Sequence, residues 1–316
     1  MCAIIVLGLN SAIDVLADVE TLAVGAVNRL RAARHHVGGK GVHVAQACAA
    51  LGEPVRLIGG VDRAHASDFA EWSRARGVTF DGVELPTRLR TCYAIRDARG
   101  AITELLEPGS PMSAPVQQAM HDRLWHAARA ARVIVLTGSL PAGCADDTYA
   151  RIIADVALRA PGAAIVLDAS GAALRAALPA GPTFVKPNQD EASALIGRPI
   201  ADADAAKAAA REIHARGAAV ALVSLGAAGV TAVWKDGLAA VRPPRVSARN
   251  AVGSGDCFVA GLAVGVARGE ATIDVLRLAT ACGAANALTD EPGWFAAADV
   301  EALRPRVDVR WIDPPA

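Results

Sequence analysis

The stretch Asn250-Ala251-Val252-Gly253-Ser254-Gly255-Asp256 leads directly into an apolar helical pattern that runs to Arg268. Gly-Ser-Gly lets the backbone turn tightly and direct its N–H groups outward, and a helix N-terminus adds partial positive charge. Together they form an anion hole suited to a transferring phosphoryl group. Asp256 falls in the first helical turn, where it could accept a proton from an attacking hydroxyl. The alternative interpretation is a glycine turn in which Asp256 only caps the helix.

On both sides of this stretch, apolar runs of strand length alternate with Ala-rich segments of helix length. Strands that are apolar throughout are buried on both faces, and their alternation with helices is typical of a parallel sheet. We therefore predict a three-layer α/β/α fold with a mostly parallel central sheet. The predicted strands are residues 4–7, 55–58, 133–137, 164–167, 183–185 and 219–223. The predicted helices are residues 42–51, 66–76, 114–130, 147–160 and 202–216, with a helical final third at 254–268, 271–288 and 297–303.

Two segments, residues 13–34 and 86–107, break this alternation with short strand-like runs and turns. Each is too short for a strand–helix–strand unit. We expect antiparallel strands from the two segments to form a small β-sheet lid. Because no repeat, linker or low-complexity segment divides the chain, residues 1–316 are predicted to form one domain that carries this lid.

The composition excludes several classes of protein. The 316 residues carry 32 basic and 32 acidic side chains, so the formal net charge is zero. A neutral chain has no global field that attracts nucleic acid or an acidic membrane surface, although it can still carry a local charged patch. With 53% hydrophobic and 20% charged residues, the chain is not intrinsically disordered. We expect no nucleic-acid partner and no membrane partner.

The cysteines and the N-terminus indicate a cytoplasmic protein. Six cysteines are scattered without a Cys-x-x-Cys pair, as expected for reduced thiols, and the first residues lack the basic start of a signal peptide. Residues 217–234 contain no charge and are long enough to span a membrane. However, Ser224-Leu-Gly226 and Gly229 interrupt the middle of this segment, so two buried strands around a turn fit better.

A second glycine-rich motif is Gly38-Gly39-Lys40-Gly41-Val42-His43, which also begins a predicted helix. Glycines and a lysine at a helix start suit a phosphate group or several sugar hydroxyls. The alternative is a helix-entry turn with a solvated lysine. His43 falls in the first turn, near any ligand, but a lone histidine is more often structural, so it is only a candidate.

A third motif is Val185-Lys186-Pro187-Asn188-Gln189-Asp190-Glu191, which leaves a buried strand and starts a helix at Asn188. Asn188 and Glu191 are three residues apart and share one helical face. Oxygen ligands of this kind suit a water-rich Mg²⁺ site beside nucleotide phosphates. A helix cap with Glu191 at the capping-box position explains the same residues equally well.

Weaker signals lie at other predicted strand ends and in the lid. Asn10 and Asp14 follow the first strand, and Ser139 lies in the loop 138–143 after another. Ligands of open α/β sheets gather at such ends. Arg88 and Arg90 begin a lid strand and could reach a ligand phosphate, although a charged, solvated edge strand is the plainer explanation. The standard dinucleotide and Walker glycine fingerprints do not fit either glycine-rich motif.

Taken together, the motifs resemble the ribokinase-like carbohydrate kinases of the PfkB family, from Asn10 to about Trp294. Within it, the branch that includes 1-phosphofructokinases and tagatose-6-phosphate kinases is most similar. The strings that carry the resemblance are GGKGVHVA (38–45), GSLPAG (138–143), LDASG (167–171), VKPNQDE (185–191), VSLGAAG (223–229) and VGSGD (252–256). Their order and spacing are those of the family. The resemblance implies a ribokinase-like fold whose β-sheet lid often also joins two subunits.

The resemblance also implies roles for individual residues. Asp256 would deprotonate the sugar hydroxyl, and Gly253, Ser254 and Gly255 would form the anion hole. The residues implied for sugar-phosphate binding are Asp14, Gly38, Gly39, Lys40, His43, Ser139 and Arg90, with Arg90 on the phosphate that the substrate already carries. The residues implied for ATP binding are Lys186, Asn188, Glu191, Ser224, Gly226, Gly229 and Asn286. Of these, Asn188 and Glu191 would organise Mg²⁺, and Asn286 would lie near adenine or ribose.

Three positions depart from the usual pattern of the branch. Ser11 stands where Pro is usual, His43 where Asn is usual, and Thr91 where Asn often follows the arginine. All three belong to the sugar side, whereas the phosphoryl-transfer side is intact. The resemblance therefore specifies the chemistry more firmly than the substrate.

The resulting hypothesis is an ATP- and Mg²⁺-dependent kinase of a phosphorylated ketohexose, with a homodimer through the lid. Two alternatives stay open. One is a kinase of an unphosphorylated sugar or a nucleoside, against which Lys40 and Arg90 argue, since a neutral sugar does not require two cations. The other is a non-catalytic regulator that binds nucleotides or sugar phosphates, against which the intact Asp256, Asn188 and Glu191 argue.

Overall fold

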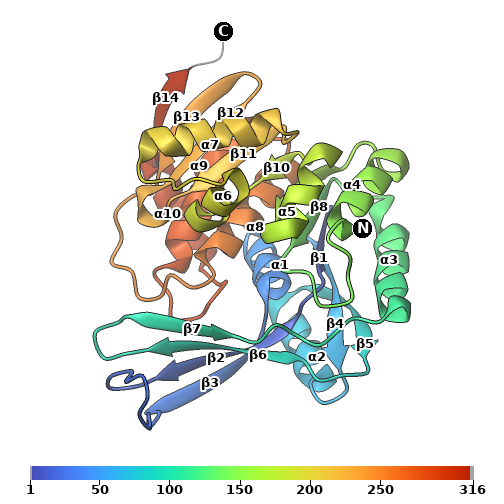
Figure 1. Cartoon of the computed structure of the whole chain (residues 1–316), viewed down its shortest axis with the longest axis vertical. Coiled ribbons are helices and arrows are strands. Elements are labelled where there is room, and N and C mark those ends of the chain that lie inside the picture. Colours follow the sequence, from blue (N-terminus) through green and yellow to red (C-terminus); the bar gives the residue numbers. More distant parts are fainter. Residues whose placement is uncertain (1, 314–316) are drawn as a thin grey trace.

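The computed structural model describes residues 2–313, and a ten-stranded sheet forms their centre (Figure 1). The strand order is β14-β13-β12-β11-β10-β9-β8-β1-β4-β5. Strands from β11 to β5 in this order are parallel, and β12, β13 and β14 add an antiparallel end. The strands are β1 (Ile4–Gly8), β4 (Val55–Asp62), β5 (Thr79–Leu85), β8 (Val133–Thr137), β9 (Ala164–Asp168), β10 (Phe184–Val185), β11 (Val220–Ser224), β12 (Val230–Trp234), β13 (Gly237–Arg242) and β14 (Asp308–Asp313). The predicted mostly parallel sheet is confirmed.

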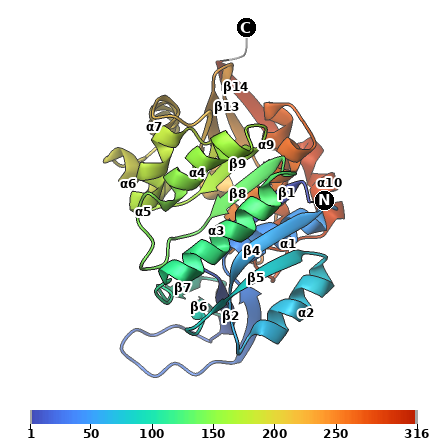
Figure 2. The ribbon, with the colours of Figure 1, turned by 90° about the vertical axis from the view of Figure 1, so that its right-hand side faces the viewer.

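Helices cover both faces of the sheet (Figure 2). One face carries α1 (Lys40–Ala50), α2 (Ala66–Arg76), α8 (Ser254–Ala267), α9 (Thr272–Asn286) and α10 (Ala297–Leu303). The other face carries α3 (Ala114–Ala128), α4 (Thr148–Arg159), α5 (Gly171–Ala177), α6 (Gln189–Ile196) and α7 (Ala203–Ala215). The expected three layers are therefore present.

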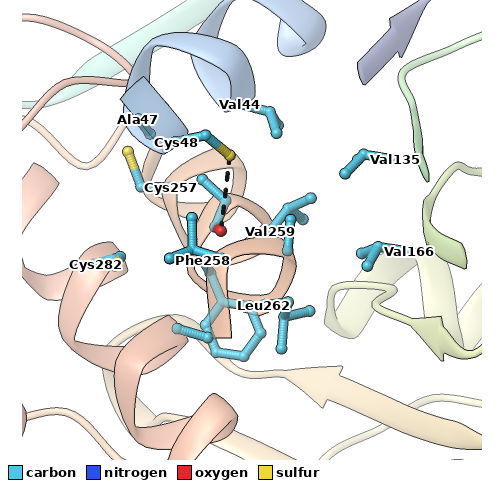
Figure 3. Packing of buried hydrophobic residues seen from close by; sticks show 14 of the residues in the cluster. Val44, Ala47, Cys48, Val135, Val166, Cys257, Phe258, Val259, Leu262 and Cys282 are labelled. Carbon is cyan, nitrogen blue, oxygen red and sulfur yellow. Dashed lines mark hydrogen bonds between the residues drawn. The ribbon is translucent and has the colours of Figure 1, made fainter. Parts of the chain in front are cut away.

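Each central strand contributes to two separate cores because successive side chains point to opposite faces. In β1, Ile4 and Val6 join the core under α1 and α8, whereas Ile5 and Leu7 join the core under α3 and α4. Figure 3 shows the first core, where aliphatic side chains of the helices pack against Val135 of β8 and other strand residues. Burying each such side chain contributes about 1.5–3 kcal/mol to the free energy of unfolding.

Small residues let α8 and α9 approach closely. A Cβ atom at Gly261 would lie 2.5 Å from the Cα of Ala279, so only glycine allows this contact. The low aromatic content is consistent with this arrangement, because alanine, valine, leucine and cysteine supply most of the core between the helices. Close packing fixes α8, and with it the anion-hole sequence at its start.

The lid is a separate four-stranded sheet in the order β3-β2-β6-β7. Its strands are β2 (Ala12–Asp18), β3 (Ala32–Gly38), β6 (Arg90–Arg96) and β7 (Ile102–Leu106). The expectation of antiparallel pairing is wrong for the central pair, because β2 and β6 run parallel. The reason is topological: β2 follows β1 and β6 follows β5, so both leave the same edge of the main sheet in the same direction.

The sequence patterns missed several elements. The final third is not purely helical, because it also supplies β14, and β5, β13 and α5 were not predicted. β5 and β14 lie at the two ends of the sheet, where half-exposed strands lack a continuous apolar run. The uncharged segment 217–234 forms β11 and β12, as predicted. None of the helices within residues 2–313 combines the length and apolarity needed to cross a membrane.

Candidate active site

The candidate site lies where α1 and α8 begin, beside the carboxyl ends of the parallel strands. Both helices start after a glycine with positive φ: Gly39 has φ 91° and Gly253 has φ 82°. At Gly253 a side chain is also excluded by space, since a Cβ atom would lie 2.2 Å from the backbone N of Gly293. The backbone of residues 253–255 is thereby fixed at the N-terminus of α8, where it can form the predicted anion hole.

Asn286 supports this loop from behind. It lies at the end of α9, is fully buried, and donates from Nδ2 to the carbonyl of Val252 (2.9 Å) and to Oγ of Ser254 (3.0 Å). Its Oδ1 accepts from the backbone N–H of Trp294. The structure thus places Asn286 under the anion hole, while its expected contact with adenine or ribose stays a prediction.

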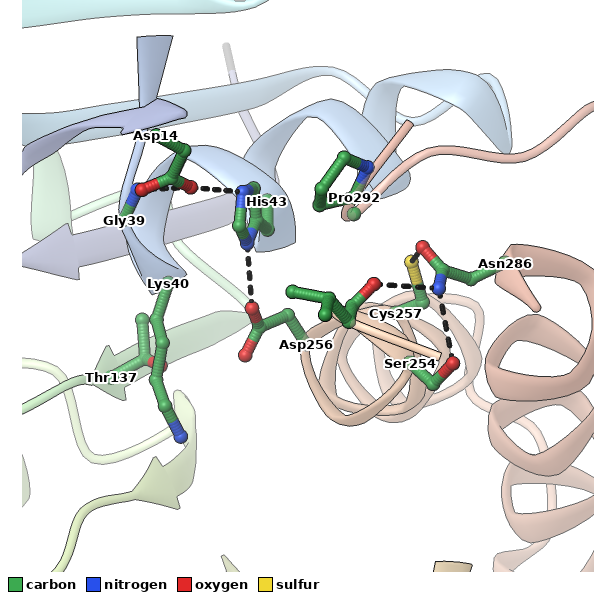
Figure 4. A network of polar contacts seen from close by, with 12 residues as sticks. Asp14, Gly39, Lys40, His43, Thr137, Ser254, Asp256, Cys257, Asn286 and Pro292 are labelled. Atoms are coloured by element: carbon green, nitrogen blue, oxygen red, sulfur yellow. Dashed lines mark hydrogen bonds and ion pairs between the residues drawn. The ribbon is translucent and has the colours of Figure 1, made fainter. Parts of the chain in front are cut away.

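Asp256 and Asp14 come together through His43 (Figure 4). Asp256 is the third residue of α8 and is 7% exposed. Its Oδ2 lies 2.8 Å from Nδ1 of His43, and Nε2 of His43 lies 2.9 Å from Oδ2 of Asp14 in β2. The same Asp14 oxygen accepts from the backbone N–H of Gly39 (3.3 Å). Gly38 leaves room for this carboxylate, because a Cβ atom there would lie 2.2 Å from Asp14 Cγ.

The protonation states of His43 and Asp14 follow from their surroundings. Burial favours a neutral ring, but hydrogen bonds and charges from Asp14 and Asp256 outweigh burial and raise the pKa of His43 to about 10. For Asp14, burial works in the opposite direction, yet His43 and the Gly39 N–H lower its pKa below the ordinary value. An imidazolium between two carboxylates is consistent with both shifts.

A buried carboxylate that the sequence interpretation did not assign joins two lysines. Asp168, at the end of β9, has no exposed surface and lies 2.8 Å from Nζ of Lys40 and 2.9 Å from Nζ of Lys186. Burial alone would raise its pKa, but Lys186 and Lys40 hold the pKa of Asp168 well below its usual range. Asp168 lies within the quoted LDASG string, directly after the predicted strand 164–167, so its position at the sheet edge was the signal available.

Lys40 stays charged at the site, and Lys186 lies beside the anion hole. The pKa of Lys40 is raised because Asp168 and Asp256 outweigh the cost of burial. A Cβ atom at Gly255 would lie 3.7 Å from Nζ of Lys186, so this ammonium group lies directly beside the anion hole. Together with the backbone N–H groups at the start of α8, the two lysine side chains suit an anionic ligand.

The predicted ATP-side residues gather at neighbouring strand ends. Asn188, which follows β10, forms a bridge with Ser224, the last residue of β11. Gly226 and Gly229 bound the short turn after Ser224. Asn188 and Glu191 form a complete capping box at the start of α6, as the alternative interpretation of this motif expected. Their oxygens therefore have a structural role in addition to any ligand contact.

The residues present fit a magnesium ion only if phosphates and water supply most of its ligands. Among residues 2–313, no cluster of three or more His, Cys, Asp or Glu side chains is arranged to hold a metal. Glu191 uses Oε2 to accept from the backbone N–H of Asn188. Mg²⁺ commonly binds through one or two carboxylates plus substrate phosphates, so Glu191 and Asn188 are compatible with such a site.

On the sugar side, Arg90 is held by the backbone. Its two terminal nitrogens donate to the carbonyls of Glu107 (3.2 Å) and Asn10 (3.0 Å), whereas its Nε is buried without a partner in the described part of the chain. Oγ of Ser139 accepts from Nδ2 of Asn10 (3.0 Å). A small pocket beside them is lined by Asn10, Ser11, Gly38, Lys40, Thr137 and Gly138.

The lid contributes one acidic group that the sequence interpretation missed. Glu104 of β7 pairs in register with Ala94 of β6, which in turn pairs with Leu16, two residues from Asp14. Asp14 and Glu104 therefore share one face of the lid. Desolvation, followed by the charges of Asp256 and Asp14, raises the pKa of Glu104. Only the pairing of lid strands brings this residue to the site, so no sequence spacing could have indicated it.

Comparisons with known proteins identify the family of the chain. The family model described as "pfkB family carbohydrate kinase" matches residues 2–293. The chain is 37% identical over 279 residues to a 1-phosphofructokinase from Xanthomonas campestris, covering 86% of this chain and 87% of that one. It is 36% identical over 275 residues to a 1-phosphofructokinase from Rhodobacter capsulatus, covering 86% of each.

A solved structure has the same fold over nearly the whole chain. Phosphofructokinase-2 from Escherichia coli, in complex with substrates and products, superposes with a TM-score of 0.88 at 27% identity, covering 96% of this chain and 98% of that one. The predicted ribokinase-like fold and family resemblance are thus confirmed. The chain belongs to the pfkB family of carbohydrate kinases and is an ATP-dependent sugar kinase.

Proposed function

We propose that the enzyme is a 1-phosphofructokinase, which transfers the γ-phosphoryl group of ATP to the free primary hydroxyl of fructose 1-phosphate. The observation that carries this proposal is the pairing of two different sites at one sheet edge. Asp256 follows the anion-hole backbone, while Lys40 and Arg90 supply cations on the sugar side. The two relatives at 36–37% identity, both named 1-phosphofructokinase, support the choice of ketohexose.

On the sugar side, charged groups would recognise the phosphate that the substrate already carries. Arg90 has a buried Nε without a partner in residues 2–313, and a substrate phosphate would satisfy it with a charge-assisted hydrogen bond. Lys40, which pairs with the buried Asp168, would add a second positive charge that attracts the dianionic sugar phosphate. Asp14 has one oxygen engaged by Gly39 and His43, and its other oxygen would accept from a sugar hydroxyl.

On the transfer side, Asp256 would accept the proton of the attacking hydroxyl. Its Oδ2 is bound by His43, so Oδ1 is the oxygen that we assign to the substrate. The backbone N–H groups of residues 253–255 and the ammonium group of Lys186 would stabilise charge that spreads over the transferred group. Mg²⁺, held through Asn188 and Glu191, would neutralise charge on the ATP phosphates.

A substrate screen tests the proposal. ADP release is measured with fructose 1-phosphate, fructose 6-phosphate, tagatose 6-phosphate and unphosphorylated fructose, at equal concentrations and with Mg²⁺-ATP. We expect the highest kcat/KM with fructose 1-phosphate. A preference for tagatose 6-phosphate would contradict the assigned substrate, and a preference for free fructose would also contradict the phosphate-binding role of Arg90. Ligand binding without turnover of any sugar would favour a regulator.

We also propose that two copies associate through their lids and that the enzyme works in the cytoplasm. Tyr93 of β6 and Leu105 of β7 pair side by side and are 39% and 55% exposed, so one lid face offers apolar surface to a partner. Light scattering at micromolar concentration should give the mass of a dimer, and a monomer mass would contradict the lid contact.

The proposal of a cytoplasmic enzyme rests on the cysteines. All six cysteines are free, as a reducing compartment requires.

A further inference from the structure

His43 makes a contact that neither the anion hole nor the sugar pocket requires. It lies in the first turn of α1 and is 6% exposed. One ring nitrogen meets Asp256 of α8 at 2.8 Å and the other meets Asp14 of β2 at 2.9 Å. The ring therefore spans from the assigned base to the assigned sugar-binding carboxylate (Figure 4).

The chemistry of these two contacts specifies the protonation of the ring. An ionised carboxylate only accepts hydrogen bonds, and a neutral imidazole has a single N–H. A neutral His43 would therefore turn one nitrogen lone pair toward a carboxylate oxygen. A doubly protonated ring satisfies both contacts, and the pKa of His43, raised to about 10 by the two carboxylates against the effect of burial, is consistent with this.

The surrounding loop holds the ring in this position. The backbone of Gly293 packs against it so closely that a Cβ atom there would lie 2.4 Å from Cβ of His43. That loop is fixed in turn by Gln46, which donates from Nε2 to the carbonyls of Pro292 (3.1 Å) and Gly293 (3.0 Å). His43 thus has little freedom to leave the two carboxylates.

We propose that His43 is a permanent imidazolium that acts as a positioning residue, orienting Asp256 so that its second oxygen faces the substrate hydroxyl and keeping Asp256 and Asp14 ionised side by side. The role in catalysis rests on the proposed function, because it requires Asp256 to be the base. The protonation of His43 does not depend on that function and can be measured separately.

Other charged groups face this cluster from the elements packed around it. They are Lys40 of α1, Glu104 of β7, His36 of β3, Arg90 of β6, and Glu291 in the loop after α9, which pairs with Arg76 of α2. Without the imidazolium, Asp14 and Asp256 would face each other as uncompensated like charges, with Glu104 nearby. One carboxyl group of such a cluster then retains a proton at higher pH.

The first experiment reads the protonation directly in the ligand-free wild-type protein. Spectra of ¹⁵N-labelled histidine at pH 8 distinguish imidazolium, in which both ring nitrogens carry protons, from a neutral ring. The His43 signals are assigned by their loss in His43→Asn. An ordinary histidine is neutral at this pH. We expect His43 to be doubly protonated, and a neutral ring would overturn the proposal whether or not the enzyme phosphorylates a sugar.

The second experiment reads the positioning role from the pH dependence of turnover. Asn is the residue usual at this position in the resembled branch, so His43→Asn should fold. It keeps a hydrogen-bond donor but no charge. At pH 6.5 we expect its kcat to be at least about tenfold below wild type, with the ratio recovering toward pH 9 as the carboxyl group that retains a proton ionises. The KM for ATP should change less than about twofold, because His43 faces the sugar side.

A matched control comes from α7. His214 is a partly buried histidine outside the site, and its Nδ1 contacts the backbone carbonyl of Ala218 (2.7 Å). His214→Asn should show the wild-type pH profile. If the loss in His43→Asn is instead the same at every pH, or if the variant equals wild type throughout, the positioning role is overturned even with an imidazolium at position 43.

Discussion

The starts of α1 and α8 are built alike but present different groups to a ligand. Each helix follows a glycine with positive φ and faces the same edge of the sheet. At α8 the proposed binding groups are backbone N–H groups, in a loop fixed by Gly253 and supported by Asn286. At α1 the proposed binding groups are side chains. Two of them, Lys40 and His43, form ion pairs with residues of other elements.

This difference is consistent with the positions at which the sequence departs from its family pattern. A backbone anion hole tolerates little change, because a side chain at Gly253 would collide with Gly293. In a site made of charged side chains, one residue can be replaced by another if the neighbouring charged groups can still pair with it. The resemblance assigns the three departures, Ser11, His43 and Thr91, to the sugar side. Four substitutions, from the largest expected effect to the smallest, distinguish the roles proposed for the phosphoryl-transfer side and the sugar side.

The largest effect should come from Asp256→Asn at the start of α8. The amide cannot accept the hydroxyl proton, so kcat should fall by about 10²- to 10⁴-fold. Asn is nearly isosteric with Asp, so the thermal unfolding midpoint should stay close to that of the wild type. ADP release and circular dichroism measure the two quantities. Retained turnover in this folded variant would exclude Asp256 as the base.

Asp168→Asn should have the next largest effect, this time on stability. Removing the carboxylate leaves Lys186, which is 4% exposed, without its counter-charge, and breaking a buried ion pair of this kind costs about 3–5 kcal/mol. Chemical denaturation measures the difference. A variant as stable as the wild type would show that the lysines do not need Asp168.

The pH dependence of stability gives a second readout for Asp168. Its pKa is lowered in the folded state, so its ionised form stabilises the fold at pH values above the unfolded pKa of about 4. This contribution is lost as the pH falls through the folded pKa. Below pH 4 the wild type should therefore lose stability more steeply than Asp168→Asn. Parallel curves would contradict the pairing.

Arg90→Ala tests the sugar side with an intermediate effect. We expect the KM for fructose 1-phosphate to rise by about 10- to 100-fold, because a charge-assisted contact to the substrate phosphate is lost. The KM for ATP should not change. Arg90 also holds the backbone of Asn10 and Glu107, so Arg90→Lys serves as the comparison that keeps the charge. Equal KM values in wild type and Arg90→Ala would remove Arg90 from the phosphate site.

The smallest effect should come from Asn188→Ala, with Asp202→Ala as its matched control. Asn188 caps α6 and Asp202 caps α7, and each accepts from the backbone N–H three residues on. Each variant should lose about 1 kcal/mol of stability. Only Asn188→Ala should also raise the KM for Mg²⁺-ATP. If both variants leave that KM unchanged, Asn188 is a cap and nothing more.

The sequence could predict those parts of the molecule that depend on local pattern. Apolar runs located most parallel strands, and glycine-rich motifs located both helix starts, because burial and tight turns leave their mark within a few residues. The hairpin of β11 and β12 was predicted because Gly226 and Gly229 interrupt the uncharged segment 217–234.

The remaining features depend on contacts between distant positions. His43 and Asp256 are 213 residues apart, and Lys40 and Asp168 are 128 residues apart. A lone histidine has no spacing that reveals two carboxylate partners, and one strand-end aspartate does not reveal two lysines. The parallel pairing of β2 and β6 was missed for a similar reason, since it follows from the direction in which both chains leave the main sheet.

The central claim is that two sites act on one phosphorylated ketohexose. Charged side chains form the sugar site, and backbone N–H groups form the phosphoryl-transfer site. Phosphorus NMR of the wild-type enzyme with Mg²⁺-ATP and fructose 1-phosphate tests it most directly. We expect a second sugar phosphate ester to appear in step with ADP, without inorganic phosphate. Unchanged fructose 1-phosphate, with ATP consumed only when an unphosphorylated sugar is added, would contradict it.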